Sequence, residues 1–255
     1  MKINNYKLFL ESTKDIEYIC HKYRISNYII HSDGTVDVNG DVDLYNKKLT
    51  QLPVKFGKVT GYFTCSNNHL TSLEGSPYWV GRYFDCSNNQ LTSLVGSPKW
   101  IGGYFSCEHN QLKTLEGSPN IILSTYYCGH NKLTTLEGSP YWISGYFDCS
   151  INQLKSLEGG PKNVLGEYLC NNNQLVNFRG FPEDYETTVW DNENMSGIYM
   201  KDNPVNKLLF NLPEYKWNKF IYWCNEYDAI DDQGKVIPER MEEVYSKLGL
   251  EYEEN

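Results

Sequence analysis

Six cysteines recur every 21 residues through the middle of this chain, and an asparagine follows each of them three positions later. The cysteines are Cys65, Cys86, Cys107, Cys128, Cys149 and Cys170, and the asparagines are Asn68, Asn89, Asn110, Asn131, Asn152 and Asn173. Self-similarity at one fixed period of this length is typical of a solenoid, in which each repeat forms one coil that packs on its neighbours. The middle of the chain is therefore predicted to be a stack of coils.

A single unit shows how one coil is built. In the segment 83–94, the apolar positions are Phe84, Cys86, Leu91 and Leu94. This spacing predicts a short strand with alternating inward and outward side chains, followed by a turn at Asn89 and a return path along the other side of the coil. The return path carries the turn motif Glu-Gly-Ser-Pro at 74–77, 116–119 and 137–140. The unit matches the leucine-rich-repeat pattern, so we expect a mainly β or α+β fold, a right-handed leucine-rich-repeat solenoid.

The same pattern extends in degenerate form beyond the six regular units. Leu44 lies one period before Cys65, and Met200 lies 30 residues after Cys170 and is followed by Asn203. About eight coils are therefore predicted, with strand centres at Leu44, at the six cysteines and at Met200. The longer final interval implies an insertion of nine residues within 183–197.

Both ends of the solenoid are predicted to be capped, because an open end exposes unpaired backbone groups and apolar core. We expect an N-terminal cap at 1–40, the solenoid at 41–204 and a C-terminal helical cap at 205–255. The first cap should contain a helix, on which Ser12 and Asp15 resemble a capping box, and a hairpin around the turn at 32–34.

The second cap is predicted to consist of short amphipathic helices. Their expected ranges are 205–210, 216–227 and 239–248, with Pro213 and Pro238 marking helix starts and a turn at 231–234.

Composition argues against two classes of partner. The chain has 23 Lys and Arg against 32 Asp and Glu, a formal net charge of −9, whereas a nucleic-acid binder needs clustered positive charge. No apolar run reaches the roughly 18 to 20 residues of a membrane-spanning helix, and the first residues lack the apolar stretch of a secretion signal. A cytoplasmic protein that binds neither nucleic acid nor membrane is expected.

The cysteine column is predicted to point inward as a small apolar layer of the core. Cβ atoms one coil apart are expected about 4.8 Å from each other, too far for an unstrained disulfide, and a straight row does not form the tetrahedral cluster of a zinc site. The asparagine column is interpreted as structural, with side-chain amides that bond the backbone of adjacent turns. The eight cysteines therefore indicate a reduced structural core.

Outward strand positions form a strip rich in tyrosine. Three positions before each cysteine stand Tyr62, Tyr83, Tyr104, Thr125, Tyr146 and Glu167. One position before each cysteine stand Thr64, Asp85, Ser106, Tyr127, Asp148 and Leu169. Two positions after each cysteine stand Asn67, Asn88, His109, His130, Ile151 and Asn172.

Tyrosine offers broad apolar area, few rotatable bonds and one hydroxyl, which suits a protein interface. The alternative is that repeat duplication copied a tyrosine that packs well along a ladder. The predicted partner-binding residues on this concave face are Tyr62, Tyr83, Asp85, Tyr104, Glu108, His109, Tyr127, His130, Tyr146 and Asp148.

A second aromatic column lies on the return side, seven positions before each cysteine. Its members are Trp79, Trp100, Ile121 and Trp142. We expect these tryptophans to pack against the proline column, which consists of Pro77, Pro98, Pro119 and Pro140. The residues that follow them, Val80, Ile101, Ile122 and Ile143, are predicted to belong to the core.

No enzyme class finds support in the sequence. Asp85 and Asp148 share a column but are expected about 14 Å apart, beyond the roughly 9.5 Å that two carboxylates of a glycosidase span. His109 and His130, with Glu108 adjacent, could make only a weak metal site because no third ligand is evident on the same face. Catalytic residues, metal and cofactor are therefore all predicted to be absent.

Two resemblances to known families rest on these motifs. The unit at 86–94 resembles the repeats of bacterial leucine-rich-repeat effectors, although about 50 residues after Pro204 are too few for the ubiquitin-ligase domain that some of them carry. The segments 32–44, 49–53 and 73–77, the close at 203–205 and the tail at 242–245 look like leucine-rich-repeat-like proteins of tailed bacteriophages. That resemblance covers nearly the whole chain and implies a fold and a viral origin, but no activity.

Together with the resemblance to phage proteins, the sequence predicts a phage-encoded, non-enzymatic protein-binding module whose concave tyrosine-rich face contacts a host protein in the host cytoplasm. A defence-system protein is one candidate partner. Two alternatives stay open: a trap for a small molecule such as a nucleotide signal, and a structural part of a virion or an oligomer assembled through the caps.

Overall fold

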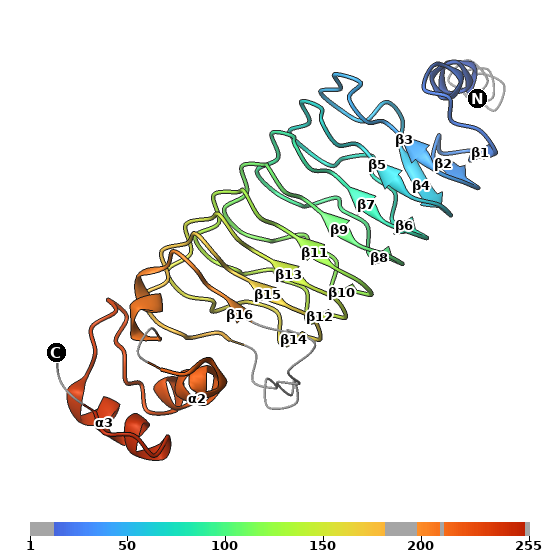
Figure 1. The fold of residues 1–255 in the computed structure, drawn as a ribbon. Coiled ribbons are helices and arrows are strands. Elements are labelled where there is room, and N and C mark those ends of the chain that lie inside the picture. The colour runs from blue at the N-terminus through green and yellow to red at the C-terminus, as the bar shows by residue number, and fades with distance from the viewer. Residues whose placement is uncertain (1–12, 182–197, 210–211, 253–255) are drawn as a thin grey trace.

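The computed structural model describes residues 13–181, 198–209 and 212–252. Within them the chain forms a β-solenoid with a helix near its N-terminus at one end and helices α2 (Trp217–Glu226) and α3 (Pro238–Lys247) at the other (Figure 1). Paired strands of neighbouring coils are offset by one period, as in Phe63 opposite Phe84. The 21-residue repeat of the sequence is therefore the repeat of the structure.

One side of the solenoid is an eight-stranded parallel sheet, which we call the front sheet (Figure 1). Its strands, in spatial order, are β3 (Val42–Asp43), β5 (Phe63–Thr64), β7 (Phe84–Asp85), β9 (Phe105–Ser106), β11 (Tyr126–Tyr127), β13 (Phe147–Asp148), β15 (Tyr168–Leu169) and β16 (Ile198–Tyr199). The cysteine of each regular coil directly follows its strand. The sheet thus runs through the six regular coils and one strand further at each end.

The other side of the coils carries two shorter sheets, which we call the return side. A five-stranded sheet contains β1 (Tyr28–Ile30), β2 (Val36–Val38), β4 (Phe56–Val59), β6 (Trp79–Val80) and β8 (Trp100–Ile101). A three-stranded sheet contains β10 (Ile121–Ile122), β12 (Trp142–Ile143) and β14 (Asn163–Val164). Ladder pairing is therefore interrupted between β8 and β10.

The core consists of columns that run the length of the stack. The inward aromatic column is buried, and its rings stack from coil to coil, with centroids 5.4 Å apart for Phe63 and Phe84 and 5.5 Å for Phe84 and Phe105. All eight cysteines are buried and free of disulfides, which confirms the inward orientation expected for the six in the repeat. Two leucine columns and the column of Val80, Ile101, Ile122 and Ile143 complete the core.

The asparagine column joins adjacent coils through its side chains. The Oδ1 atom of Asn89 accepts a hydrogen bond from the Leu70 amide at 2.9 Å, and its Nδ2 atom donates to the carbonyls of Cys65 and Cys86 at 3.0 and 3.1 Å. The pattern repeats from coil to coil as far as Asn203, whose amide donates to the carbonyls of Cys170 and Met200. Each asparagine therefore satisfies buried backbone groups of two coils at once.

At the N-terminal end, a helix over residues 13–22 and the antiparallel hairpin β1–β2 precede the first coil. The hairpin turn is closed by the Gly34 amide, which donates to the His31 carbonyl, and by Asp33, which accepts from the Thr35 amide. The hairpin joins the return side, since β2 pairs with β4. Ser12 of the expected capping box and the expected insertion at 183–197 lie outside the described residues.

At the C-terminal end, the segment expected to be a helix over 205–210 begins as a 3-10 helix, η2 (Pro204–Leu208). A short 3-10 turn, η3 (Glu214–Lys216), leads into α2. Helix α3 begins at Pro238, where the missing N–H costs nothing, and buries Met241 and Val244. The turn expected at 231–234 is present, closed by the Gly234 amide on the Asp231 carbonyl.

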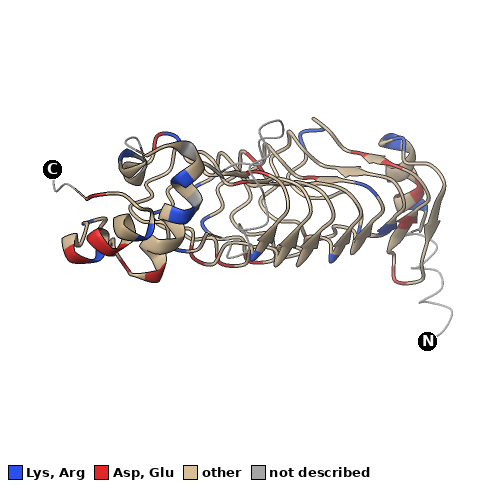
Figure 2. Ribbon diagram, turned by 60° about the horizontal axis from the view of Figure 1, so that its bottom comes forward, with Lys and Arg blue, Asp and Glu red and all other residues tan. Residues whose placement is uncertain are grey.

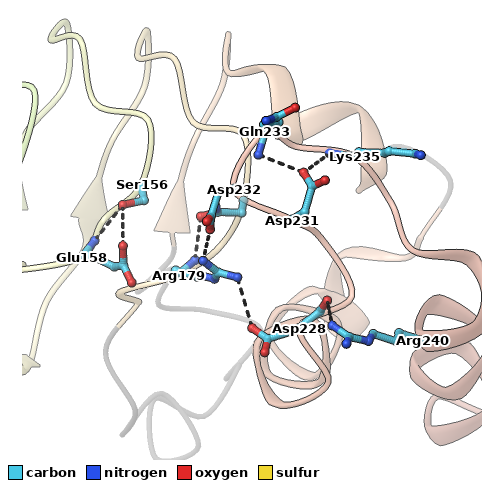
Figure 3. Close-up of polar contacts among 10 residues, drawn as sticks. Ser156, Glu158, Arg179, Asp228, Asp231, Asp232, Gln233, Lys235 and Arg240 are labelled. Carbon is cyan, nitrogen blue, oxygen red and sulfur yellow. Dashed lines mark hydrogen bonds and ion pairs between the residues drawn. The ribbon is translucent and has the colours of Figure 1, made fainter.

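An ion-pair cluster ties this helical end to the last regular coil (Figure 3). The Arg179 guanidinium contacts the carboxylates of Asp228 and Asp232 in the loop between α2 and α3. The Asn225 amide donates to the Phe178 carbonyl at 2.9 Å, and Gly234 packs directly against Val176, where a Cβ atom would lie 2.8 Å from the valine Cβ. Close backbone approach at Gly234 therefore seats the loop on the coil.

Candidate interaction surface

Three tyrosines form a continuous ring stack on the front face, which we call the tyrosine stack: Tyr62, Tyr83 and Tyr104. Ring centroids are 4.7 Å apart for the first pair and 4.6 Å for the second, and the ring planes differ by 3° and 4°. Each ring stands one residue before a front strand, so the pairing of β5, β7 and β9 places the rings one above another. The strand spacing of about 4.8 Å matches the separation that offset-stacked rings prefer.

The row changes character beyond Tyr104. Thr125 occupies the next position of this column, and Tyr127 from the neighbouring column contacts Tyr104 edge-on, with centroids 6.0 Å apart and planes at 79°. Tyr146 is 45% exposed. The predicted tyrosine row is therefore an ordered stack only in the N-terminal part of the front sheet.

Stacking decides which parts of these rings a partner can reach. Because the faces of Tyr62, Tyr83 and Tyr104 cover one another, a planar ligand could enter between two of them only if their centroids separated to about twice the present distance. Ring edges and hydroxyls are what the stack offers. This geometry does not favour the expected alternative of a planar ligand held between the tyrosines.

The outward aspartates of the front strands also serve the backbone. Asp43, Asp85 and Asp148 each use Oδ1 to accept a hydrogen bond from the amide two residues later, at 2.9 Å in all three cases. These bonds fix the turn that follows each strand. Within the described part of the chain no donor bonds the second carboxylate oxygen, Oδ2, of Asp43 or Asp85.

An open depression of about 340 Å³ lies over the first four strands of the front sheet, and we call it the front hollow. Its aromatic wall is formed by Tyr45 and by the tyrosine stack. Its acidic groups are Asp43 and Asp85, and small polar residues fill the remainder: Thr64, Ser66, Asn67 and Ser87. Three of the five predicted tyrosines, those of the tyrosine stack, therefore share this hollow with Asp85.

Burial and nearby carboxylates raise the pKa of the phenols in the tyrosine stack. Burial is the largest cause that raises the pKa of Tyr62 and Tyr83 above the ordinary value, and the charges of Asp41 and Asp43 add to it. Burial and then Asp85 raise the pKa of Tyr104 to about 12. At neutral pH each hydroxyl can therefore both donate and accept a hydrogen bond.

His109 and His130 stack on each other, with ring centroids 4.0 Å apart. Both residues are exposed and have positive φ angles of 52° and 53°. All six residues two positions after the cysteines share this left-handed conformation, with Ile151 at 55°. This column is therefore a backbone turn in every coil, whereas the sequence analysis interpreted it as a strip of outward side chains. Asparagine, which adopts the left-handed conformation more readily than most residues, occupies three of the six positions and was the signal available in the sequence.

Glu108 and Asp148 flank a gap that Gly129 leaves in the front face. A Cβ atom at Gly129 would lie 3.4 Å from Oε1 of Glu108 and 3.6 Å from Oδ1 of Asp148. Burial, and then the charge of Asp148, raises the pKa of Glu108. Together with the two histidines, Tyr127 and Tyr146, these residues form a second group of predicted site residues, in the coils of β9, β11 and β13, which begins where the front hollow ends.

The front hollow also contains residues that were not predicted. Asp43 and Tyr45 belong to the degenerate first coil, which has Leu44 where later coils have cysteine. Stepping the aspartate column back from Asp85 by two periods would have reached Asp43. Within the ranges the structure describes, no three His, Cys, Asp or Glu side chains come together in a group that could hold a metal ion.

On the return side, Trp79 and Trp100 form a stack of their own, with centroids 4.7 Å apart and planes 3° apart. The ammonium of Lys58 lies 4.4 Å from the centroid of Trp79. Each indole leans over the glycine two positions later, Gly81 or Gly102, where a Cβ atom would meet the ring at 3.1 or 2.9 Å. Packing of the tryptophans on the proline column stays a prediction, although those prolines are buried as such packing requires.

Charged residues are unevenly distributed. Figure 2 shows acidic segments on the C-terminal helices, while most of the ribbon of the coils carries no charged residue. In the part of the chain the structure covers, no helix is long and apolar enough to span a bilayer.

Comparisons with models of known protein families, with curated proteins and with solved structures gave no match.

Proposed function

We propose that this chain is a non-enzymatic protein-binding module whose front face contacts a partner protein around the tyrosine stack. The observation that supports it is the ordering of three half-buried tyrosines along the rim of the front hollow. Rings already fixed by their neighbours lose little conformational entropy when a partner covers them, which is the advantage of tyrosine at interfaces.

We also propose that the coils are of the leucine-rich-repeat type and that the solenoid contains about eight of them. In its support, the five coils from Cys65 to Cys149 each place two leucines after an asparagine that bonds the backbone, and the strands at Leu44 and Met200 continue the front sheet beyond the cysteine-containing coils. From the resemblance to phage proteins we further propose a host protein as partner and the host cytoplasm as the place of binding.

The test is affinity capture from bacterial extract with quantitative mass spectrometry, using the full chain and two double variants. Tyr83→Ser with Tyr104→Ser removes the centre of the tyrosine stack. Tyr78→Ser with Tyr141→Ser is the matched control, because these tyrosines are 59% and 57% exposed and precede return strands. We expect the front variant to lose its specific partner at least about tenfold and the control to retain it.

A third variant separates loss of contact from loss of fold. Tyr83→Phe with Tyr104→Phe keeps both rings and the stack but removes the hydroxyls, so its thermal unfolding should match that of the natural chain. Retention of the same partner by the Ser variant, at the level of the control, would show that the front face is not the binding face.

A further inference from the structure

The front hollow has a negative electrostatic character. Asp43 and Asp85 line it, and Asp41 is close enough to raise the pKa of Tyr62 and Tyr83. Arg82 is the cation that acts on Tyr62, and it does not line the hollow. An anionic group entering the hollow would face two carboxylates and no basic side chain among the lining residues, whereas a cation would be attracted.

The polar atoms of the hollow are suited to accept hydrogen bonds. Asp43 and Asp85 each commit Oδ1 to a backbone amide and leave Oδ2 available within the described residues. Hydroxyls of Tyr62, Tyr83 and Tyr104 add further acceptors at intervals of one coil. A group that carries several N–H donors and a positive charge, such as a guanidinium or an ammonium, matches this set.

The shape of the hollow indicates how such a cation is presented. It extends from Tyr45 in the first coil to Tyr104 in the fourth, and the two aspartates lie on strands β3 and β7, two strand spacings or roughly 10 Å apart. One cation cannot neutralise both carboxylates at contact distance. Basic side chains carried on one extended segment can reach the two positions together, because their long stems span the depth of an open hollow.

We propose that the front hollow binds arginine or lysine side chains of an extended basic segment in a partner protein, with Asp43 and Asp85 as the charge partners and the tyrosine stack as the wall. This inference rests on the proposed function, since it names the chemistry of the partner at the same face. The net charge of −9 acts in the same direction by attracting a basic partner over a longer range.

The experiment measures binding of labelled, unstructured Gly/Ser peptides by fluorescence anisotropy. The peptides carry several arginines, several lysines or several glutamates. We expect the two basic peptides to bind, with affinity that falls as salt is raised, and the acidic peptide not to bind. Equal binding of the acidic peptide, or absence of binding by both basic peptides, would overturn the proposal.

Asp43→Asn with Asp85→Asn isolates the charges, because asparagine retains Oδ1 for the amide that follows each strand. The matched control is Glu116→Gln with Glu137→Gln, which removes the same number of charges from exposed positions of the return path, outside the hollow. We expect the first pair to weaken binding of the basic peptides by about tenfold and the control by less than about twofold. An equal effect of both pairs would overturn the proposal.

Two further measurements separate the possible outcomes. Arginine amide and spermidine, added as competitors, test whether a free cation suffices; displacement at concentrations equal to that of the peptide would assign the hollow to small amines and overturn the peptide proposal. Capture of the natural partner by the Asn pair, together with its loss in the Tyr83→Ser and Tyr104→Ser variant, would leave the proposed function standing and reject only the basic segment.

Discussion

The front and return sides of the solenoid are built from the same coils, but they differ in how continuously their strands pair. The front sheet is continuous over eight strands, whereas the return side divides into sheets of five and three strands. Both sides carry stacked aromatic pairs with centroids 4.7 Å apart, Tyr62 with Tyr83 and Trp79 with Trp100. Outward aromatic stacking therefore does not account for the continuity of the front sheet.

The distinguishing element is the buried polar column behind the front strands. Each asparagine links two coils through buried hydrogen bonds. The small cysteine side chains form the buried column next to the asparagines. The buried residues of the return strands themselves are apolar, such as Val80 and Ile101. Because buried asparagine hydrogen bonds hold the front strands together, the outward side chains of the front sheet are not needed for this and can bind a partner.

The cysteine column should make the front side sensitive to alkali. Burial raises the pKa of all six repeat thiols above the ordinary value of 9.0. A raised pKa in the folded state means that the unfolded chain releases the proton first, so this stabilisation is complete below pH 9 and is lost as the pH rises above it. Six thiols at about 1.4 kcal/mol per pH unit lower the free energy of unfolding by about 8 kcal/mol near pH 10.

Urea unfolding monitored by circular dichroism between neutral pH and about pH 10 measures this loss. Cys86→Ala with Cys128→Ala removes two of the six thiols and should reduce the loss near pH 10 by about 3 kcal/mol. The return-side core residues Ile101 and Ile122 do not titrate, so Ile101→Val with Ile122→Val should lower stability equally at every pH. A pH dependence unchanged by the cysteine substitutions would show that other groups cause it.

The asparagine column is tested by Asn110→Ala. Asn110 accepts a hydrogen bond from the Leu91 amide and donates to the carbonyls of Cys86 and Cys107, all in buried surroundings. Alanine leaves the Leu91 amide without a partner, whereas the two carbonyls keep the donors Asn89 and Asn131, and we expect a loss of about 2 kcal/mol in the free energy of unfolding. Asn163→Ala, in the return strand β14, should cost less than about 0.5 kcal/mol, because that side chain is only half-buried. Similar losses at the two positions would remove the proposed difference between the two sides.

Much of this organisation could be predicted because the repeat separates residue types by column. Alternation around each cysteine identified Phe84 and Cys86 as core, and the fixed offset identified Asn89 as a backbone partner. The longer interval to Met200 did not obscure the pattern, since Asn203 repeats the hydrogen bonds of the regular coils. These features depend on local chemistry that recurs in every coil.

Other features depend on geometry that no column of the sequence records. Asparagine marks the left-handed turn two residues after the cysteine in three coils only, because His109, His130 and Ile151 occupy it in the other three. The aspartates of the front strands could be read as binding groups, but their bonds to following amides are visible only in the structure. The front hollow could not be predicted because two of its lining residues, Asp43 and Tyr45, belong to the first coil, which has Leu44 in place of the repeat cysteine.

The smallest expected effect concerns the turn itself, and it has opposite signs on the two sides. Ile151 holds a φ of 55° in the front turn, a conformation that costs a β-branched residue about 1 kcal/mol or more, while its side chain is 41% exposed. Ile151→Asn, which restores the residue found at Asn67, Asn88 and Asn172, should raise the free energy of unfolding by about 1 kcal/mol.

Ile121→Asn makes the same chemical change in return strand β10, where the side chain is 51% exposed and the backbone is extended. Here asparagine replaces a residue that suits a strand, so we expect a loss of about 0.5 kcal/mol. Urea unfolding of the two variants side by side gives both values. Because the substitution is identical, a gain of stability at position 151 and a loss at position 121 would reflect the backbone conformation that each position requires. A loss of stability at both positions would mean that the packing of Ile151 contributes more to the free energy of unfolding than its positive φ angle costs.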